Sequence, residues 1–249
     1  MRLLERAYVR YLRNQVIRGQ VPQHLGLIMD GNRRWARKAG FADVSVGHRY
    51  GADHLESVLG WCYQVGIYEV TAYVASADNL RKRSDHEVNA LLGLIETALP
   101  RALNQTRSPW SLRLAGQISA LPVSTAGALE RCVEATRERP CRVTLGIGYD
   151  PRSDMLEAFK NALARLAATG RSPAEIAETL TVTDITESAA DQLGTDIDYV
   201  LRTSGERRIS GFFPWQSTRA NIYFTRTYWP GLRESDFLRA IKGYSQRTH

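Results

Sequence analysis

The chain has 249 residues, of which 43% are hydrophobic and 24% are charged, an ordinary composition for one folded domain with a sizeable core. Its 33 Lys and Arg residues against 26 Asp and Glu residues give a formal net charge of +7. This favours an anionic partner, such as a phosphorylated substrate, a membrane surface or a nucleic acid. Its three widely spaced cysteines argue against a zinc site or a disulfide framework and fit a reducing compartment.

Two of these partner classes are disfavoured by how the residues are distributed. The cations gather around two segments without a recognisable nucleic-acid-binding module, so we expect no nucleic acid partner. No apolar run approaches the roughly 20 residues of a membrane span, and the first residues lack the apolar region of a signal peptide. We therefore expect a cytoplasmic protein with at most peripheral membrane contact.

The first predicted element, over residues 2–18, is a basic amphipathic helix. Its apolar residues recur near helical spacing: Leu4, Ala7, Tyr8, Leu12 and Val16. Such a helix could dock on a membrane close to a lipid-like substrate, or it could pack on the body of the protein or on a partner subunit. We favour packing, and we treat residues 1–20 as an N-terminal helix that precedes a domain over residues 21–249.

The rest of the chain alternates between apolar strand-like runs and helical segments. Strands are predicted at 25–29, 69–74, 112–115, 142–147, 197–201 and 221–225, and helices at 48–65, 85–104, 122–137, 153–168 and 233–247. Residues 169–173 and 192–196 read as surface loops. This alternation predicts an α/β fold: a single domain with a central, mostly parallel sheet flanked by helices.

The most informative segment is residues 24–38. The apolar run Leu25–Met29 stops at Asp30-Gly31-Asn32, and a cationic helical segment follows. In α/β proteins, ligands bind in the crevice beyond the carboxyl end of a strand, where glycine permits close approach and free helix N–H groups and arginines attract anions. One carboxylate among so many cations makes sense if it holds Mg²⁺ shared with phosphate oxygens. The segment therefore predicts a metal-assisted phosphate or diphosphate site.

These residues also carry a resemblance. The pattern His-x4-Met-Asp-Gly-Asn-x-Arg-Trp-Ala resembles the first signature of the cis-prenyltransferases, the undecaprenyl diphosphate synthase family. A second match spans Asp198–Ser210 and continues through 212–216 and 228–230. The resemblance covers roughly residues 20–247. It implies transfer of a prenyl group from an allylic diphosphate, Mg²⁺ as cofactor, and a homodimer formed through the region near Trp215 to Trp229.

The resemblance also implies roles for individual residues. Asp30 would hold Mg²⁺ on the diphosphate of the allylic substrate, and His48 would lie near that diphosphate as it departs. Four residues would cradle the diphosphate and a fifth would support their loop: Gly31, Asn32, Arg33, Arg34 and Trp35. Prenyl transfer separates an allylic cation from its diphosphate, so the enzyme must stabilise the negative charge of the departing diphosphate with fixed positive charge. The hydrocarbon needs an apolar tunnel, which the helices at 48–65 and 85–104 could line.

Two further segments match the family. Residues 76–81 occupy the place of its flexible catalytic loop, with matches at Ser76, Asn79 and Arg81 and with departures at Ala77, Asp78 and Leu80. This position supports a closing lid that orients substrates. Three residues match the site for the second, homoallylic diphosphate: Arg202, Arg208 and Ser210. The planar guanidinium group suits phosphate oxygens in a fixed orientation.

Several departures concern the second substrate. Asn221 stands where the family has a glutamate that reaches the metal, often across a dimer interface, and an amide is a poorer Mg²⁺ ligand than a carboxylate. Residues 148–154 replace a Tyr-Gly-Gly-Arg pattern, Gly116-Gln117 replaces Gly-Asp, and residues 43–46 lack an arginine that often precedes Gly-His. The phosphate-binding residues of the family are therefore retained, while the residues around the second substrate differ from the family pattern.

Three hypotheses follow. The first is a short-chain cis-prenyltransferase that extends dimethylallyl or geranyl diphosphate with isopentenyl diphosphate. The second is an irregular, lavandulyl-type enzyme in which dimethylallyl diphosphate is the nucleophile and the product is branched; Asn221 and Ala77 favour it, and we place it close to the first. The third is a noncatalytic partner subunit. It is disfavoured because the chain keeps Asp-Gly-Asn together with the arginines at 34, 202 and 208.

Overall fold

The computed structural model describes residues 3–103 and 108–246. Its centre is a sheet of six strands: β1 (His24–Ile28), β2 (Glu69–Ser76), β3 (Trp110–Ala115), β4 (Cys141–Tyr149), β5 (Tyr199–Arg202) and β6 (Asn221–Phe224). The order is β3-β4-β2-β1-β5-β6, and every neighbouring pair is parallel. All six predicted strands are present, and the predicted mostly parallel sheet is parallel throughout. The single α/β domain is confirmed.

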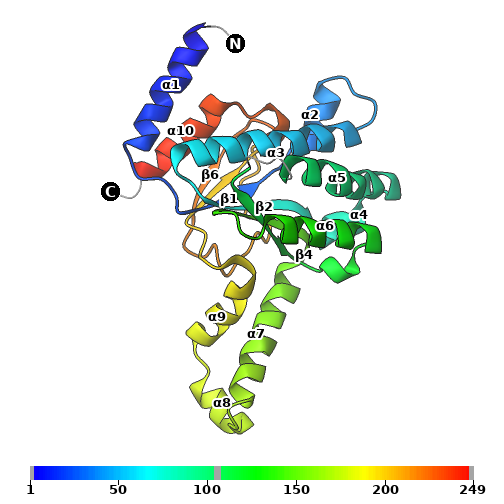
Figure 1. Cartoon of the computed structure of the whole chain (residues 1–249), viewed down its shortest axis with the longest axis vertical. Coiled ribbons are helices and arrows are strands. Elements are labelled where there is room, and N and C mark those ends of the chain that lie inside the picture. The colour runs from blue at the N-terminus through cyan, green and yellow to red at the C-terminus, as the bar shows by residue number, and fades with distance from the viewer. Residues whose placement is uncertain (1–2, 104–107, 247–249) are drawn as a thin grey trace.

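Helices surround this sheet (Figure 1). They are α1 (Leu3–Ile17), α2 (Asn32–Lys38), α3 (Ser45–Val65), α4 (Ala77–Lys82), α5 (Asp85–Leu103), α6 (Val123–Thr136), α7 (Pro151–Ala167), α8 (Pro173–Thr179), α9 (Val182–Leu193) and α10 (Glu234–Ser245), with short 3₁₀ turns η1 (Ile118–Ala120) and η2 (Trp229–Gly231). Three terminal residues of predicted helices lie outside the described residues: Arg2 at the start of the helix over 2–18, Asn104 at the end of the helix over 85–104 and Arg247 at the end of the helix over 233–247.

The sheet topology places a crevice between β1 and β5. The chain leaves β1 toward β2 on one side and later returns as β5 on the other side, with Ile28 opposite Arg202. Connections that depart in opposite directions leave the carboxyl ends of two neighbouring strands uncovered, and ligands bind there in open α/β sheets. Asp30 lies just after β1, and Arg202 is the last residue of β5.

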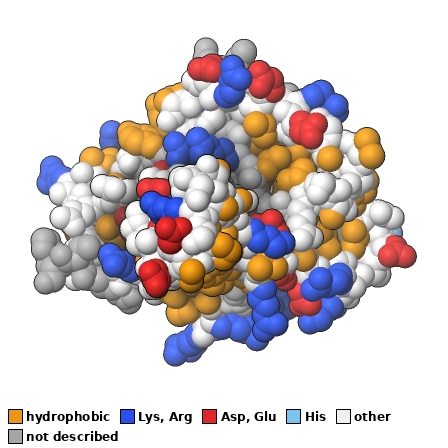
Figure 2. Space-filling view, turned by 90° about the horizontal axis from the view of Figure 1, so that it is seen from below, with side chains coloured by type: hydrophobic (Ala, Val, Ile, Leu, Met, Phe, Trp, Pro, Cys, Tyr) orange, Lys and Arg blue, Asp and Glu red, His pale blue; other side chains and the backbone are white. Residues whose placement is uncertain are grey.

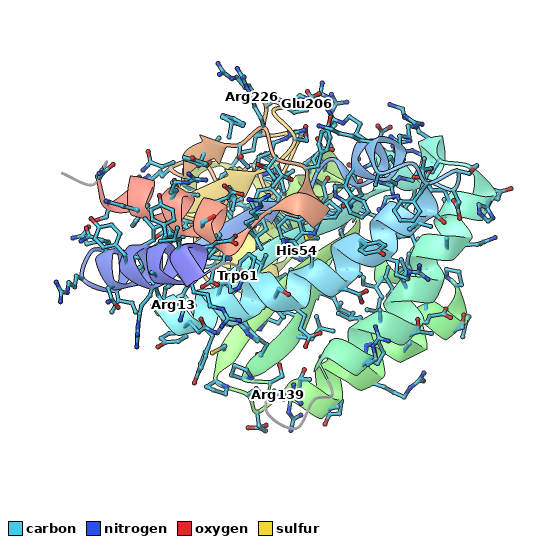
Figure 3. All side chains as sticks on the ribbon, turned by 90° about the horizontal axis from the view of Figure 1, so that it is seen from above. Arg13, His54, Trp61, Arg139, Glu206 and Arg226 are labelled. Carbon is cyan, nitrogen blue, oxygen red and sulfur yellow. The ribbon has the colours of Figure 1, made fainter. Side chains whose placement is uncertain are left out.

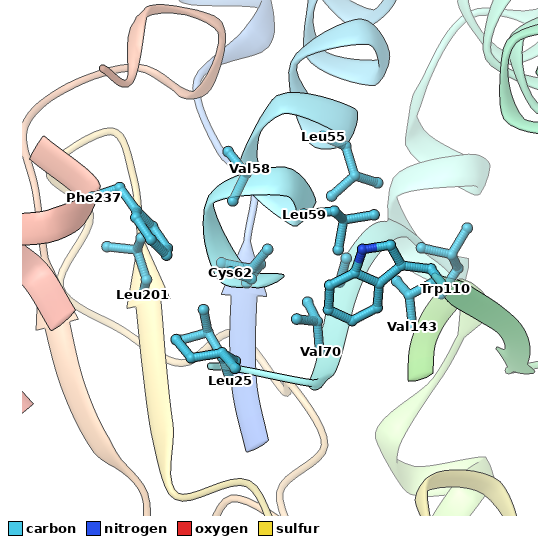
Figure 4. Packing of buried hydrophobic residues seen from close by; sticks show 14 of the residues in the cluster. Leu25, Leu55, Val58, Leu59, Cys62, Val70, Trp110, Val143, Leu201 and Phe237 are labelled. Atoms are coloured by element: carbon cyan, nitrogen blue, oxygen red, sulfur yellow. The ribbon is translucent and has the colours of Figure 1, made fainter. Parts of the chain in front are cut away.

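The largest core lies between one face of the sheet and helices α3, α5 and α10. Leu25 and Leu27 of β1 face α3, where Val58 and Cys62 are completely buried (Figure 4). On the opposite face, Gly26 leaves room for an aromatic ring, since a Cβ there would lie 2.6 Å from Phe212 Cε1. Both faces are therefore covered, as expected for a parallel sheet.

Helix α1 packs on α10, as we expected for the N-terminal helix. Its buried residues are Val9, Leu12 and Val16, and Arg13 pairs with Glu234 of α10. The predicted apolar stripe was partly wrong, because Leu4 is 84% exposed and Tyr8 is also exposed. No helix within residues 3–103 and 108–246 is long and apolar enough to cross a membrane.

Helices α8 and α9 were not predicted. Together with α7 they form an arm that extends away from the sheet (Figure 1). Helix α9 does show an apolar period, since its buried residues Ile185, Ala189 and Leu193 recur every four positions, whereas α8 has only seven residues, too few to show a clear one. Ser172 and Glu175 nevertheless form a capping box, in which the serine hydroxyl accepts the Glu175 N–H and the glutamate accepts the Ser172 N–H. The sequence signal for this helix start was the Ser-x-x-Glu pattern of Ser172 and Glu175, with Pro173 at the first helical position.

Candidate active site

Asp30 is the centre of a polar cluster at the carboxyl edge of the sheet. Arg202 Nη2 donates to its Oδ2 at 3.1 Å, Ser204 Oγ at 2.9 Å, and Arg34 Nη2 donates to its Oδ1 at 3.3 Å. Partial burial favours the neutral acid, but these hydrogen bonds and the charge of Arg34 hold the pKa of Asp30 below its usual range. The carboxylate is therefore ionised and surrounded by donors.

The backbone around Asp30 is shaped for close approach. Gly31 has a φ of +103°, and a Cβ there would lie 2.7 Å from Tyr228 Cδ1, so only glycine fits. Helix α2 starts at the next residue. Trp35 packs on the α3 side, with its ring centroid 4.9 Å from that of Tyr50. Arg34 also lies over the ring of Tyr228, 5.5 Å from its centroid.

Arg202 connects Asp30 to the segment that follows β5. Its side chain is 4% exposed; Nη1 donates to Ser210 Oγ at 2.7 Å and to the carbonyl oxygen of Arg208. Ser204 and Ser210 both have positive φ values, 83° and 53°. Serine adopts this conformation at an energetic cost, which is typical of binding sites. The structure therefore brings together Asp30, Arg34, Arg202 and Ser210.

Arg208 takes a different position from the one expected. Its side chain is 71% exposed and pairs with Glu206 at 3.7 Å, so only its backbone carbonyl reaches Arg202. Glu206 and Arg226 lie near each other on the loops after β5 and β6 (Figure 3). On the face shown in Figure 2, cationic side chains are mixed with acidic ones, and hydrophobic side chains border a hollow.

A second charged cluster surrounds Glu87 at the start of α5. Its carboxylate lies 3.0 Å from His48 Nε2, 3.5 Å from Arg83 Nε and 3.8 Å from Arg33 Nε. Burial lowers the pKa of His48, opposed by its hydrogen bond with Glu87. Burial likewise lowers the pKa of Arg83, whose Nε and Nη1 are buried without a hydrogen-bond partner among the described residues. The sequence reasoning identified His48 and Arg33 but missed Glu87 and Arg83.

The predicted catalytic loop is helical. Ser76 ends β2 and caps α4 by accepting the N–H of Asn79 at 3.0 Å. Arg81 is 69% exposed and lies 3.8 Å from Asp78, away from the Glu87 cluster. Arg83, and not Arg81, therefore lies in the cluster with Glu87 and His48. The sequence did hold a signal for the pairing of Arg83 with Glu87, because the two residues are four positions apart at the start of the predicted helix over 85–104.

An apolar cavity of about 270 Å³ lies between α3 and α5, where the tunnel was predicted. Asn32 and His48 line it near the polar clusters, and Trp110 of β3 lines it too. Further apolar lining comes from Leu55, Leu59, Leu91, Leu94, Ala98 and Val143. A concave apolar space beside a few converging polar groups is the usual form of a small-molecule site.

Asn221 lies apart from this site within one chain. It is exposed at the amino end of β6, and the strand register places it about 16 Å from the level of Asp30 along the strand direction. Trp229 is buried, with its Nε1 donating to the carbonyl of Gly51, and Trp215 Nε1 donates to Thr186. Trp229 therefore packs in the core, whereas Trp215 is partly buried against the residues of α7 and α9.

The side chains at this site determine whether it could hold the implied Mg²⁺. Among the described residues, no group of three or more Asp, Glu, His or Cys side chains could hold a metal ion. Asp30 is instead a single ionised, partly exposed carboxylate in a cationic crevice. Mg²⁺ commonly binds one or two carboxylates together with substrate phosphates and waters. The site therefore fits Mg²⁺ that arrives with a diphosphate.

Proteins of known family are similar to this chain along most of its length. Residues 28–249 match the sequence model of a family described as putative undecaprenyl diphosphate synthase. An isoprenyl transferase of Streptomyces fradiae is 46% identical over 96% of this chain and 94% of its own. A (2Z,6E)-farnesyl diphosphate synthase of Mycolicibacterium smegmatis is 38% identical over 99% of this chain and 95% of its own.

Two solved structures share the fold. Lavandulyl diphosphate synthase from Lavandula x intermedia, in complex with dimethylallyl diphosphate, has a TM-score of 0.82 at 26% identity. A probable undecaprenyl diphosphate synthase from Campylobacter jejuni has a TM-score of 0.71 at 25% identity. Each comparison covers 90% of this chain and 95% of the other.

Proposed function

Because the chain belongs to the undecaprenyl diphosphate synthase family and is a prenyltransferase, we propose that it joins an allylic diphosphate to a second five-carbon isoprenoid diphosphate and makes a short product. The observation that carries this proposal is the apolar cavity that adjoins the cluster of Asp30, Arg34 and Arg202. A diphosphate in the cluster would direct its hydrocarbon between α3 and α5. The modest cavity volume, about 270 Å³, suits a short chain, and the Mycolicibacterium relative is named for a farnesyl product.

The first step is departure of the diphosphate from the allylic carbon. Asp30 is the residue that would hold Mg²⁺, which, when bound, supplies positive charge to the leaving oxygens. Arg34 adds a fixed cation beside Asp30, and Arg33 and Arg83 add two more beside His48. These groups are held in place by Glu87 and Ser204 before substrate arrives, so they would stabilise the departing charge without reorganising.

The second step is attack on the allylic carbon by a double bond of the other isoprenoid; the cation formed on that isoprenoid then loses a proton from an adjacent carbon to the departed diphosphate or to water, which restores a double bond. Arg202 and Ser210 would hold the second diphosphate, since Arg202 Nε is buried without a hydrogen-bond partner in the described part of the chain. Arg202 also contacts Asp30. One side chain therefore fixes the distance between the two diphosphates and orients the nucleophile.

An irregular, lavandulyl-type coupling is the second candidate. It is supported by Asn221 and Ala77 in the sequence and by the TM-score of 0.82 with the lavandulyl diphosphate synthase structure. A noncatalytic partner subunit is a weaker candidate, because Asp30, Arg34 and Arg202 converge as a complete charged cluster. We also propose a homodimer, in which Asn221 on the edge strand β6 would face a second copy.

A product assay tests the proposal. Purified protein with Mg²⁺ receives dimethylallyl or geranyl diphosphate, with or without isopentenyl diphosphate, and dephosphorylated products are identified by mass spectrometry and NMR. A linear product that requires isopentenyl diphosphate supports the short-chain synthase. A branched product from dimethylallyl diphosphate alone supports the irregular enzyme, and Asn221→Glu should then shift activity toward linear product. If none of these reactions yields a product, the proposal is contradicted.

A further inference from the structure

Two glycines of α3 lie directly against Asn32, the first residue of α2. A Cβ atom on Gly51 would lie 2.7 Å from the carboxamide oxygen Oδ1 of Asn32, and one on Gly47 would lie 2.2 Å from its backbone carbonyl oxygen. Cβ atoms in proteins essentially never come within 3.0 Å of such an atom. The Gly47 contact is with backbone, so helices α2 and α3 reach their present separation because position 47 lacks a side chain, whereas the Gly51 contact is with the Asn32 side chain and bears on its orientation.

Local helix formation does not explain glycine at position 51. The residue lies in the interior of α3, where alanine is intrinsically more favourable, and its backbone does not adopt a positive φ. The requirement is steric and comes from the contacts just described, together with Trp229, whose Cδ1 would lie 3.1 Å from the added atom. Gly93 of α5 offers a contrast, since nothing lies within 4 Å of a Cβ built there.

The Asn32 side chain is held by packing. Its Oδ1 is buried and has no hydrogen-bond partner among the described residues. Buried amide oxygens are normally paired, so here no hydrogen bond to the oxygen from the described part of the chain holds the side chain, and packing against α3 sets its orientation. Asn32 lines the cavity together with His48 and Gly51, next to the Asp30 cluster. With its oxygen against α3, its NH₂ group is the donor available to a diphosphate oxygen.

We infer that Gly51 is a positioning residue: its bare Cα fixes the orientation of the Asn32 carboxamide, which then donates to the diphosphate of the allylic substrate. This inference rests on the proposed function and extends it to a residue outside the charged clusters. A methyl group at position 51 would displace the amide while leaving the side chains of Asp30, Arg34 and Arg202 unchanged. A misplacement of about 1 Å costs up to roughly 100-fold in rate at such a site.

A double-mutant cycle tests this. Wild type, Gly51→Ala, Asn32→Ala and the double variant are compared in steady-state prenyl transfer, with Gly93→Ala as the matched glycine-to-alanine control in a helix. We expect Gly51→Ala to lower kcat roughly 10- to 100-fold with little change in the KM of the second substrate. The same change should cause no further loss once Asn32 is alanine, because coupled residues are not additive. Gly93→Ala should retain wild-type turnover.

Three outcomes would overturn the inference. The first is an equal loss from Gly51→Ala with and without the Asn32 side chain, which would assign the effect to helix packing or Trp229. The second is wild-type turnover in Gly51→Ala. The third concerns folding: if Gly51→Ala is poorly folded, removing the clashing side chain in the double variant should restore its melting temperature, and failure to do so contradicts the contact.

A binding measurement separates this inference from the proposed function. Inorganic pyrophosphate with Mg²⁺ is titrated into each folded variant by calorimetry. Gly51→Ala should weaken pyrophosphate binding as much as Asn32→Ala does, and Gly93→Ala should not weaken it. If wild type forms no prenyl product but this pattern holds, the proposed function fails and the positioning role stands. If wild type is active but Gly51→Ala binds pyrophosphate normally, the positioning role fails.

Discussion

The carboxylate of Asp30 and the guanidinium group of Arg202 lie 3.1 Å apart although 172 positions separate them in the chain. Strands β1 and β5 are neighbours, with Ile28 opposite Arg202, so the pair spans the crevice where the two strands end. Arg202 is buried and Asp30 is partly exposed. Each charge therefore depends on the other, and a change at either residue should affect both stability and binding.

Asp30→Asn should abolish prenyl transfer while the protein still folds. The amide keeps the shape of the side chain but cannot hold Mg²⁺ on a diphosphate as a carboxylate does, so we expect a loss of at least about 100-fold in kcat/KM. Arg202 loses its charged partner, so the free energy of unfolding should fall by about 1–2 kcal/mol. Product assays and urea unfolding measure the two effects.

Asp53→Asn is the control for this substitution. Asp53 pairs with Arg101 at 3.2 Å, and both side chains are exposed, so little change in stability or activity is expected. Normal product formation by Asp30→Asn would remove Asp30 from the metal role.

Arg202→Lys should weaken the second substrate more than the first. A lysine keeps the charge but cannot reach Asp30, Ser210 and the Arg208 carbonyl at once, as the guanidinium group does. We expect a rise of roughly 10-fold or more in the KM of the second diphosphate, with a smaller change for the allylic substrate. Arg171→Lys, at an exposed arginine beside α8 that donates a hydrogen bond to Thr179, should change both values little. Equal losses for both substrates in Arg202→Lys would contradict the assignment.

Glu87→Gln should lower turnover through residues that it holds. The neutral amide would no longer balance Arg33 and Arg83 or fix His48, all of which lie within 3.8 Å of the carboxylate. We expect a loss of roughly 10- to 100-fold in kcat, because the cations around the departing diphosphate lose their fixed positions. Glu157→Gln, which removes an exposed pair with Lys160, serves as a control. Unchanged kcat in Glu87→Gln would show that the cluster serves folding alone.

Much of the fold was predictable because its strands are continuous apolar runs separated by long helices. The buried run at Leu25–Met29 and the alternation of elements sufficed for the parallel sheet. Helix α8 was missed because seven residues carry little periodicity, and α9 was missed although Ile185, Ala189 and Leu193 follow helical spacing. The α1 stripe was misread because Val9, not Tyr8, faces α10.

The site was predictable where a residue lies inside a contiguous motif. Asp30, Arg34 and Arg202 do converge, as their two motifs predicted. Glu87 was missed because two of its partners, Arg33 and His48, are distant in sequence, and its local pair with Arg83 resembles an ordinary ion pair at a helix start. Arg81 was selected because it lies in the segment that resembles the family's catalytic loop, whereas Arg83 lies just after α4, outside the matched residues.

Ala98→Phe should shorten the accepted hydrocarbon. Ala98 lines the cavity on α5, and a phenyl ring there would occupy part of its volume of about 270 Å³. Geranyl diphosphate should become a poorer substrate while dimethylallyl diphosphate remains usable, since only the longer chain needs the filled space. Competition between the two allylic substrates measures this preference. Ala164→Phe on the exposed face of α7 is the matched control, and an unchanged preference in Ala98→Phe would argue against hydrocarbon binding there.

The stability of the protein should fall as the pH drops below about 6.5, partly because of His54. Burial lowers the pKa of His54 from 6.5 to about 4, against a hydrogen bond with the backbone of Leu232. Its ring meets those of Trp61 and Trp229 edge to face, with centroid distances of 5.5 and 5.2 Å; His54 and Trp61 are labelled in Figure 3. The unfolded chain therefore binds a proton more readily than the folded chain between these two pKa values, so stability rises with pH there.

His54→Phe isolates this contribution. Phenylalanine retains the aromatic packing but cannot be protonated, so the loss of unfolding free energy between pH 7.5 and pH 5 should shrink by about 2 kcal/mol. Urea unfolding at a series of pH values provides the measurement. His86→Gln, at an exposed histidine, should keep the wild-type dependence. Some dependence should remain in His54→Phe, because burial also lowers the pKa of His24 and His48. Parallel curves for wild type and His54→Phe would mean that the folded protein accommodates the His54 proton without cost.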